Sequence, residues 1–285
     1  MAKLSVIIPS KTEVFLKKTT EDVLGKSTGD IEILVGLDGY EEIDKVDDPR
    51  VTYFSLPAST SNQKRHIVNK AVEMSKGDYV MSLDAHCMMT KGFDEQLIKD
   101  HKPNWIQIPR RNRLDAEKWC IQDQMGRPPV DYEYIMWQPI LKKEGFHGYK
   151  WDERTLTRKD IMIDDTMAIQ GSCWFCTKEW FKKMGFMQIE GYTGWGQEGE
   201  EVSFKTWKNG GRVVTNKFTN YSHLHKGRKY GRMYHLNKGE TLESYKYSYN
   251  YWVHENKDFF INLVEKFSPL PNWPSNWVEI IYGEK

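Results

Sequence analysis

The sequence predicts an α/β fold in which a mostly parallel sheet is flanked by helices. Short runs rich in β-branched and aliphatic residues alternate with segments of helical length over the first part of the chain. Such alternation with short connections is typical of parallel strands joined by crossover helices. Of the 285 residues, 39% are hydrophobic and 28% charged, and the formal net charge is +1. This composition is ordinary for a globular protein, and the net charge gives no general argument for nucleic-acid binding.

Four strands are expected in this first part, at 4–8 (stopped by Pro9), 31–35, 51–54 and 78–83. Two helices are expected between them, at 12–24 and 62–74, and the second carries an apolar stripe from Ile67 to Met74. Ligands of such sheets bind beyond the carboxyl ends of the strands. We therefore expect a ligand site near Ser10 to Glu13, Asp38 and Asp84.

The rest of the chain divides into an insertion, a return to regular structure and a tail. Residues 109–165 are rich in Arg, Lys, Pro, Trp and Tyr with little periodicity, and predict a long irregular insertion that binds an acceptor or acts as a lid. Further strands are expected at 166–170, 174–177 and from Val213, and helices at 178–184, 198–208 and 244–260. We assign residues 1–226 to the main domain and 227–285 to a C-terminal helical and aromatic extension packed on it.

Asp84 and His86 stand where the strand 78–83 runs out into a loop. Residues i and i+2 of a strand point to the same face, so the two side chains can converge on one point. A carboxylate oxygen and an imidazole nitrogen suit a divalent ion of intermediate hardness such as Mn²⁺, with Mg²⁺ as the alternative. If the ion also holds a diphosphate, the chain can stabilise a phosphate leaving group.

The cysteine and hydropathy patterns bear on the cellular compartment. The four cysteines (Cys87, Cys120, Cys173 and Cys176) fit a reducing compartment without a disulfide framework. We interpret Cys173 and Cys176 as buried structural residues rather than as a metal or redox pair. The chain has no run of 18 apolar residues, and its N-terminus resembles a strand more than a signal segment. A cytoplasmic protein without a membrane span is expected.

Three motifs resemble a known family. The segment 195–211 reads WGQEGEEVSFKTWKNGG and resembles the acceptor-side motif W-G-G-E-N-x-E-x-S-F-x-x-W-x-C-G-G of polypeptide N-acetylgalactosaminyltransferases. Asp84-Ala-His-Cys87 is similar to that family's D-A-H-C metal motif, and Val6-Ile-Ile-Pro9 to the opening strand of family-two-like glycosyltransferases. The resemblance covers residues 3–235. It implies a GT-A type, Rossmann-like catalytic domain over 1–226 and a metal-dependent transferase that uses a UDP-sugar.

By this resemblance, Asp84 and His86 bind the Mn²⁺ or Mg²⁺ that carries the donor diphosphate. The third ligand in the family is a downstream histidine. We prefer His225, because Arg228 follows three residues later as in the family, and His223 is the alternative. The run from His225 onward is basic and contains no acid up to residue 232, so it can screen a diphosphate. A solvated basic loop is the plainer interpretation of that run.

The nucleotide is expected over the first strand ends. Pro9, Thr12 and Glu13 follow the first strand, and Asp38 follows the second, where related enzymes place a carboxylate against a uracil-type base. Arg65 matches a family arginine that faces the donor. Each of these polar residues also has a plainer interpretation as a helix cap or an exposed side chain, and Asp38 is equally well explained as a turn residue.

Residues of the 195–211 segment are assigned to catalysis and sugar binding by the same resemblance. Trp195 offers a stacking plane for a sugar, and Glu198 a carboxylate for sugar or acceptor hydroxyls. Glu201 lies three residues after Glu198, so both can face one side of a helix N-terminus. Acidic residues also favour a first helical turn for structural reasons alone, but the match across the motif favours function. Trp207 would line the site, with a core position as the alternative.

The sequence also bears on stereochemistry. Related galactosyltransferases with a W-G-G-E-D motif use the Asp after the Glu as a base, and here that position is Gly199. Glycine cannot act as a base, so a retaining, front-face reaction without a protein nucleophile is favoured. Glu200 or Glu201 remains a candidate base if the loop is shifted. In either case the metal and the basic run would stabilise the departing nucleotide diphosphate.

The acceptor is the least determined partner. Arg110-Arg-Asn-Arg113, the basic run and the many aromatics motivate a hydroxymethylated base in phage-type DNA as the acceptor. Protein Ser/Thr, a glycan and a lipid-linked precursor are the alternatives. A non-catalytic sugar-nucleotide-binding module is a competing class, but its metal motif would be eroded. A nuclease or hydrolase would need more clustered carboxylates.

Overall fold

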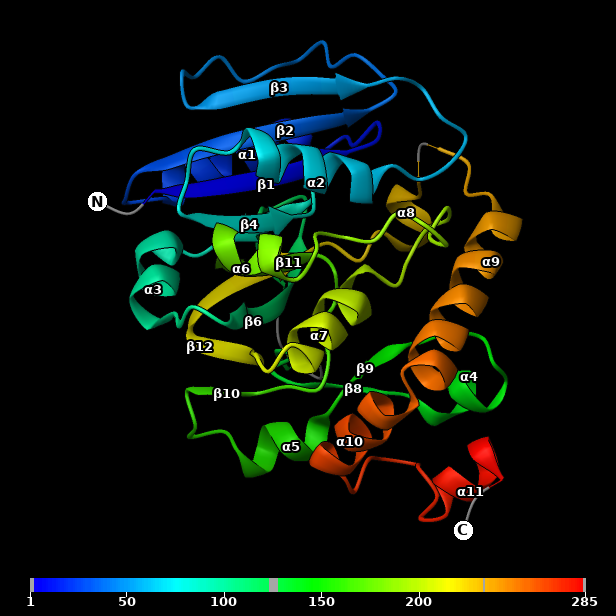
Figure 1. The fold of residues 1–285 in the computed structure, drawn as a ribbon. Helices are drawn as coiled ribbons and strands as arrows, with labels where there is room; N and C mark the ends of the chain where they lie inside the picture. The colour runs from blue at the N-terminus through cyan, green and yellow to red at the C-terminus, as the bar shows by residue number, and fades with distance from the viewer. Residues whose placement is uncertain (1–2, 123–127, 233, 284–285) are drawn as a thin grey trace.

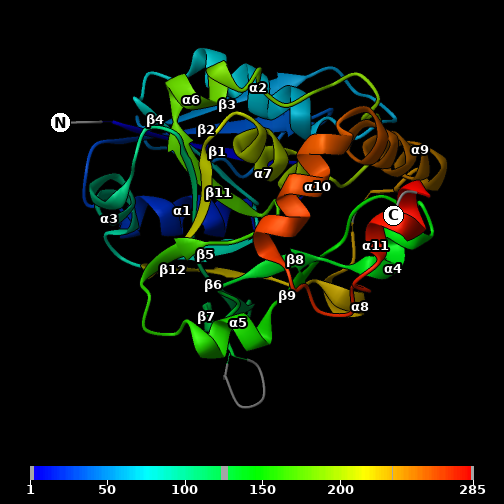
Figure 2. The same cartoon turned by 60° about the horizontal axis from the view of Figure 1, so that its bottom comes forward.

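A computed structural model describes residues 3–122, 128–232 and 234–283 (Figure 1). One sheet runs through the molecule in the strand order β10-β12-β6-β11-β4-β1-β2-β3, with β5 paired to β12 and β7 paired to β6. Helices cover both faces of this sheet, and a second group of helices stands beside it (Figures 1 and 2). Within the described residues, no helix combines the length and the apolar character that a membrane crossing requires.

The N-terminal half is the parallel α/β unit that the sequence predicts. Its strands are β1 (Leu4–Ser10), β2 (Ile31–Asp38), β3 (Val51–Leu56) and β4 (Tyr79–Leu83), and its helices are α1 (Leu16–Lys26) and α2 (Lys64–Met74). β1 pairs in parallel with both β2 and β4. β1 extends through Pro9 because its ladder with β4 ends at Ile7, so the missing N–H interrupts no pairing on that side.

The other half of the sheet is mixed in direction. Its strands are β5 (Cys87–Met89), β6 (Trp105–Asp115), β7 (Cys120–Ile121), β10 (Ile163–Asp165), β11 (Cys173–Thr177) and β12 (Arg212–His223). β11 is antiparallel to both β4 and β6, whereas β12 is parallel to β6. The helices α3 (Phe93–Asp100), α6 (Lys178–Lys183) and α7 (Glu198–Lys208) accompany these strands. The GT-A type α/β class is confirmed, with parallel order concentrated in its first strands.

The strand expected at 166–170 does not form, and the strand lies at 163–165 instead. Residue 168 makes only an isolated bridge to Glu133. The segment is apolar because it is buried between β8 and α7. On one side the Thr166 hydroxyl accepts from the Glu133 amide, and on the other the Ile169 amide donates to the Ser203 hydroxyl of α7. The apolar residues of 166–170 therefore reflect burial, and the segment resembles a strand in sequence although it pairs with no strand over its length.

Residues 109–165 are far more regular than the sequence predicts. Besides the end of β6, β7 and β10, they form β8 (Glu133–Ile135), α4 (Trp137–Leu141), β9 (Gly148–Lys150) and α5 (Asp152–Thr157). β8 and β9 pair as an antiparallel hairpin. These elements have three to six residues each, too short for a helical or strand period to emerge from the sequence.

The C-terminal extension is helical, as expected, and it packs against the insertion. It contains α8 (Gly227–Tyr230), α9 (Lys238–Tyr249), a π-helical turn (Asn250–Glu255), α10 (Lys257–Phe267) and α11 (Trp277–Tyr282). α9, α10 and α11 lie on the side where α4 and the β8–β9 hairpin lie (Figures 1 and 2).

Two large hydrophobic cores and one small cluster around Leu114, Ala116 and Leu224 hold the described residues together. The first joins the sheet to α1, α2, α3 and α6 and includes the buried Cys87, Cys173 and Cys176. The second contains aromatic residues of the insertion and the extension together: Tyr132, Trp137, Phe146, Trp151, Trp252, Phe260 and Trp277. Trp207 of α7 packs against both. Large buried aromatic area in the second core explains the high aromatic content of the chain.

Candidate active site

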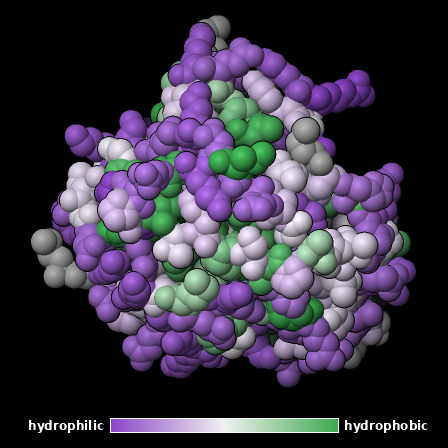
Figure 3. All heavy atoms as spheres, turned by 90° about the horizontal axis from the view of Figure 1, so that it is seen from above, coloured by the Kyte–Doolittle hydropathy of each residue, from purple (hydrophilic) through white to green (hydrophobic). Residues whose placement is uncertain are grey.

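A cleft of about 760 Å³ opens at the carboxyl ends of β1, β2 and β4. One wall, here called the strand-end side, contains Pro9, Ser10, Lys11, Glu13, Asp38, Asn62, Lys64, Asp84, Ala85, His86 and the stretch 223–227. The opposite wall, here called the hairpin side, contains Glu133, Phe146, His147, Gly148, Glu198, Gly199, Glu200 and Tyr245. Seen from above in the view of Figure 3, the molecular surface is mostly hydrophilic with scattered apolar residues.

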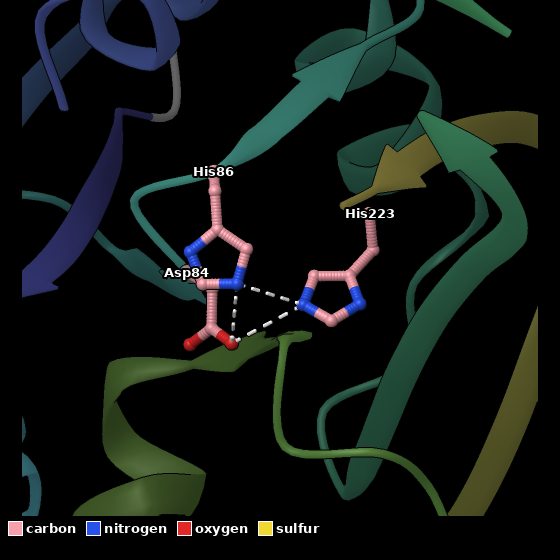
Figure 4. Close-up of side chains that lie close together, drawn as sticks. All are labelled: Asp84, His86 and His223. Carbon is pink, nitrogen blue, oxygen red and sulfur yellow. Dashed lines mark hydrogen bonds and ion pairs between the residues drawn. The ribbon is translucent and has the colours of Figure 1, made fainter. Parts of the chain in front are cut away.

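Asp84, His86 and His223 converge on one point of the strand-end side (Figure 4). Each contributes one possible ligand atom, and these atoms all lie within 4.8 Å of one another. The two Nε2 atoms are 3.1 Å apart, and Asp84 Oδ2 lies 3.6 Å from His223 Nε2 and 3.9 Å from His86 Nε2. The pairing of β5 with β12 places His223 opposite Cys87, which brings it beside His86.

The surroundings of this cluster favour the ligand forms of its side chains. Burial lowers the pKa of His223 to about 3, so its imidazole is neutral at physiological pH. Burial by itself would raise the pKa of Asp84, but the charge of Lys64 and the hydrogen bond with His223 lower it well below its usual range. Glu13 Oε2 stands 3.4 Å from His86 Nδ1. A neutral nitrogen pair and an ionised carboxylate are a donor set that fits Mn²⁺.

The geometry favours His223 over His225 as the third member of the cluster. The ring of His225 lies 5.1 Å from that of His223, and its side chain lines the cleft outside the three-residue group. β12 ends at His223, so the strand alternation that would turn residue 225 to the same face no longer applies. Arg228, on which the preference for His225 depended, is exposed on α8 and is absent from the cleft lining.

Each carboxylate of the strand-end side has an ammonium partner. Lys11 Nζ lies 3.1 Å from Asp38 Oδ2, and Lys64 Nζ lies 2.7 Å from Asp84 Oδ1. Lys226 donates to Glu13. Lys64 also donates to the Gly171 carbonyl at 2.9 Å, which fixes it between the two walls. Sequence reasoning missed Lys11 and Lys64, because an isolated lysine in a loop or a first helical turn carries no signal.

The nucleotide-binding residues expected from the sequence are partly assembled. Pro9, Glu13 and Asp38 line the cleft, and Asp38 accepts further hydrogen bonds from the Gln63 side chain at 2.7 Å and the Gln63 amide at 3.2 Å. Thr12 is not among the lining residues, and its hydroxyl donates to the Lys11 carbonyl at 2.7 Å.

Arg65, Glu201 and Trp207 lie behind the cleft wall instead of in it. Arg65 is 2% exposed and Glu201 is 1% exposed, and the two form an ion pair. Glu201 also accepts from Lys205 at 2.8 Å and from the Gln188 amide at 2.7 Å. Trp207 donates to the Met167 carbonyl at 3.1 Å from its position between the two cores. The three residues therefore hold α7 in place, and the core alternative for Trp207 describes its position.

The start of α7 carries the motif residues that do reach the cleft. Glu198 is 7% exposed, and its Oε1 atom has no hydrogen-bond partner. Trp195 is 37% exposed, with the guanidinium of Arg232 at 4.8 Å from its ring. Gln197 has φ +66° where the family motif has glycine, a left-handed conformation that costs about 1 kcal/mol. Two hydrogen bonds to the backbone of Phe146, at 2.9 and 2.7 Å, hold it there.

Gly199 is required by a close approach. A Cβ atom at this position would lie 2.1 Å from the Ile169 carbonyl oxygen and 2.7 Å from the Gly171 amide nitrogen. The beginning of α7 is therefore pressed against the loop 169–171, whose residues line the cleft. The glycine that replaces the family's larger residue reflects this packing, and it carries no catalytic side chain.

The hairpin side contains three carboxyl groups, of which only Glu133 forms an ion pair among the described residues. Glu133 pairs with Arg111 at 2.6 Å, whereas Glu200 accepts from the Gly148 amide at 3.3 Å. Burial and the nearby charges of Glu133 and Glu198 raise the pKa of Glu200 to about 8. This is the reverse of the strand-end side, where each carboxylate is paired.

The fold and this cleft define a GT-A type protein: strand ends bearing a possible metal site and lysines, facing a second wall suited to hydroxyl groups. The chain belongs to the glycosyl transferase family 2, whose family model matches residues 5–185.

Curated relatives bear out the resemblance seen in the motifs. "Probable N-acetylgalactosaminyltransferase 7" of Caenorhabditis elegans is 26% identical over 171 residues, which are 58% of this chain and 28% of the relative. Polypeptide N-acetylgalactosaminyltransferase 4 of Mus musculus is 26% identical over 190 residues, 65% of this chain and 31% of the relative. The chain thus spans about a third of the length of these relatives.

A solved structure supports the fold over nearly the whole chain. The crystal structure of GalNAc-T7 with UDP, GalNAc and Mn²⁺ superposes with a TM-score of 0.69 at 19% identity. The match covers 98% of this chain and 53% of the other. The insertion and the C-terminal extension are therefore included in the shared architecture.

Proposed function

We propose that the protein is a metal-dependent glycosyltransferase that moves a sugar from a UDP-sugar to a hydroxyl acceptor. The observation that carries this proposal is the cluster of Asp84, His86 and His223 at the strand ends, inside a cleft that also contains three lysines. The names of the relatives, together with the UDP and GalNAc in the GalNAc-T7 crystal structure, support UDP-GalNAc as the first donor to test.

The residues present fit a divalent metal. The facing Nε2 atoms of His86 and His223 and the ionised oxygen of Asp84 would hold it, and Glu13 Oε2, 3.4 Å from His86 Nδ1, can orient that ring. When bound, Mn²⁺ would neutralise the charge of a diphosphate leaving group as a Lewis acid.

The chain's own residues would bind and orient the donor. Lys11, Lys64 and Lys226 place ammonium groups around the strand ends, where they can contact phosphate oxygens after exchanging their carboxylate partners. Asp38 stands at the carboxyl end of β2, the position expected for a carboxylate near the base. Trp195 offers a ring for a sugar face, and the unpaired Oε1 of Glu198 can accept from a sugar hydroxyl.

We infer that the acceptor is a neutral hydroxyl compound, with protein Ser/Thr favoured by the names of the relatives. The names of the relatives give no support to a DNA acceptor. Gly199 provides no base, so a retaining reaction, in which the acceptor attacks the face that the diphosphate leaves, remains the favoured course.

The test is a panel of UDP-sugars with Mn²⁺, assayed by UDP release with Ser/Thr peptides, glycans and hydroxymethylated DNA as acceptors. We expect Mn²⁺-dependent release from UDP-GalNAc, increased by a peptide and abolished in Asp84→Ala. Asp152→Ala is the matched control, because Asp152 is an exposed carboxylate on α5 outside the cleft lining. Absence of UDP release from every donor, or wild-type rates in Asp84→Ala, would overturn the proposal.

A further inference from the structure

Glu200 is a cleft carboxyl that the motif comparison leaves without a role, since it occupies the variable position of W-G-G-E-N-x-E. It lines the hairpin side, whereas its neighbour Glu201 is turned away into the ion pair with Arg65. Of the two glutamates that the sequence offers beyond Glu198, only Glu200 can therefore contact a substrate.

The groups around Glu200 come from four elements, α7, β8, β9 and α9. Glu198 lies on its own helix, and Glu133 faces it from β8. The Gly148 amide donates to it from β9, next to His147, and Tyr245 of α9 lines the same wall. Arg111 neutralises Glu133 by an ion pair at 2.6 Å, and the nearby Arg65 is already bound to Glu201. No described cation pairs with Glu200.

Carboxyl groups that share a poorly solvated site are unfavourable when all are ionised, because like charges at short range repel; Glu133 and Glu198 are buried here, and Glu200 is half-buried. Glu133 is paired with Arg111, and Glu198 faces the charge of Lys64, which leaves Glu200 as the group whose charge is least compensated. The raised pKa of Glu200, about 8, agrees with this geometry. A second independent feature lies on the same wall: Glu198 lines the cleft, and its buried Oε1 atom has no hydrogen-bond partner.

We propose that Glu200 acts as a neutral carboxylic acid that positions the acceptor by a hydrogen bond to its reacting hydroxyl. The protonated carboxyl can donate through its O–H while its other oxygen accepts from the Gly148 amide. Glu198, lacking a partner at Oε1, can accept from the same substrate. Glu200 is thus a positioning residue, and this inference rests on the proposed function.

The role predicts an alkaline limit to catalysis. Above pH 8 the carboxyl ionises, loses its donor and adds a repulsive charge, so kcat/KM should fall about tenfold per pH unit. Two neighbouring groups cannot cause a fall in kcat/KM near pH 8. Burial raises the pKa of Tyr245 above its usual value and lowers the pKa of His147 below its usual value. Burial also lowers the pKa of Lys205 to about 8, so Lys205, which pairs with Glu201 behind the wall, needs a control.

The experiment compares wild type, Glu200→Gln, Glu200→Ala and Lys205→Arg between pH 6 and 10. The readout is Mn²⁺-dependent UDP release from UDP-GalNAc, or whichever UDP-sugar the panel identifies, with water as acceptor. We expect Glu200→Ala to lower kcat/KM by about tenfold to a hundredfold at pH 7, as for a lost hydrogen bond. Glutamine, a neutral donor and acceptor, should restore most of that loss and remove the alkaline fall, whereas Lys205→Arg should retain it.

A second readout is independent of activity. ¹³C NMR of side-chain carboxyls should reveal one glutamate that titrates near pH 8 in the wild type and is missing in Glu200→Gln. Titration of every glutamate below pH 6, a wild-type rate in Glu200→Ala, or an alkaline fall that persists in Glu200→Gln would each overturn the inference. A wild type that cleaves no UDP-sugar would instead contradict the proposed function itself.

Discussion

The two walls of the cleft differ in whether their carboxyl groups are paired with cations. On the strand-end side, Asp38, Asp84 and Glu13 are paired with Lys11, Lys64 and Lys226 respectively. On the hairpin side, Glu200 has only a backbone amide and Glu198 has an oxygen with no partner at all. One wall thus contains both signs of charge at close range, and the other an excess of carboxyl groups.

This difference fits two different kinds of ligand. Paired charges can be exchanged, so the lysines can bind an anionic diphosphate while the freed carboxylates bind a metal or a base. Carboxyl groups without a cation partner favour ligands that form hydrogen bonds, and hydroxyl groups supply both a donor and an acceptor. The two walls also have different surroundings: the first lies at the ends of the sheet strands, and the second combines the start of α7 with residues of the insertion and of α9.

The largest expected effect tests the strand-end side. Asp84→Ala should lower kcat by about a thousandfold or more, because the metal that we propose it binds would contribute several kcal/mol to stabilising the leaving group. The measurement is UDP release, alongside Mn²⁺ affinity by electron paramagnetic resonance, with Asp152→Ala as control. Retained Mn²⁺ affinity in Asp84→Ala would mean that this wall does not contain the metal site.

The next effect separates the two candidate histidines. His223→Ala should weaken Mn²⁺ binding by about a hundredfold, whereas His225→Ala should weaken it less than about tenfold, since only His223 lies in the cluster. Isothermal titration with Mn²⁺ and UDP measures both. The reverse order would restore the sequence-based preference for His225.

A third change addresses the scaffold between the walls. Glu201→Gln should lower the free energy of unfolding by about 3 kcal/mol, because it leaves the buried Arg65 without its counter-ion. Denaturant titration measures the loss, and kcat of the folded protein should change far less than in Asp84→Ala. A large loss of kcat without a loss of stability would instead support the sequence-based assignment of Glu201 as a catalytic residue.

The last comparison concerns the pH dependence of stability. The raised pKa of Glu200 means that the folded state retains a proton that the unfolded chain loses near pH 4.5. The contribution of this group to the free energy of unfolding therefore falls as pH rises from about 4.5 to 8 and is constant above. Melting temperatures of wild type and Glu200→Gln should converge at low pH and differ most, in favour of the variant, above pH 8. A difference that is independent of pH would contradict the raised pKa.

The sequence predicts one wall better than the other, and the reason is physical. The first four strands and α2 are coherent local patterns, and the parallel topology places Pro9, Asp38 and Asp84 at one edge. The hairpin side arises from short elements brought together by aromatic packing, so Glu133, His147 and Tyr245 carry no local signal. Arg65 and Glu201 were assigned to the site because motif matching does not distinguish a buried ion pair from a ligand-binding pair.

The most direct test of the two-wall account is anomalous scattering from crystals of the protein soaked with Mn²⁺ and UDP. We predict a manganese peak coordinated by Asp84, His86 and His223, with the diphosphate beside the lysines of the strand-end side and the hairpin side open. A peak held by His225 in place of His223, or a diphosphate seated against Glu198 and Glu200, would contradict the account.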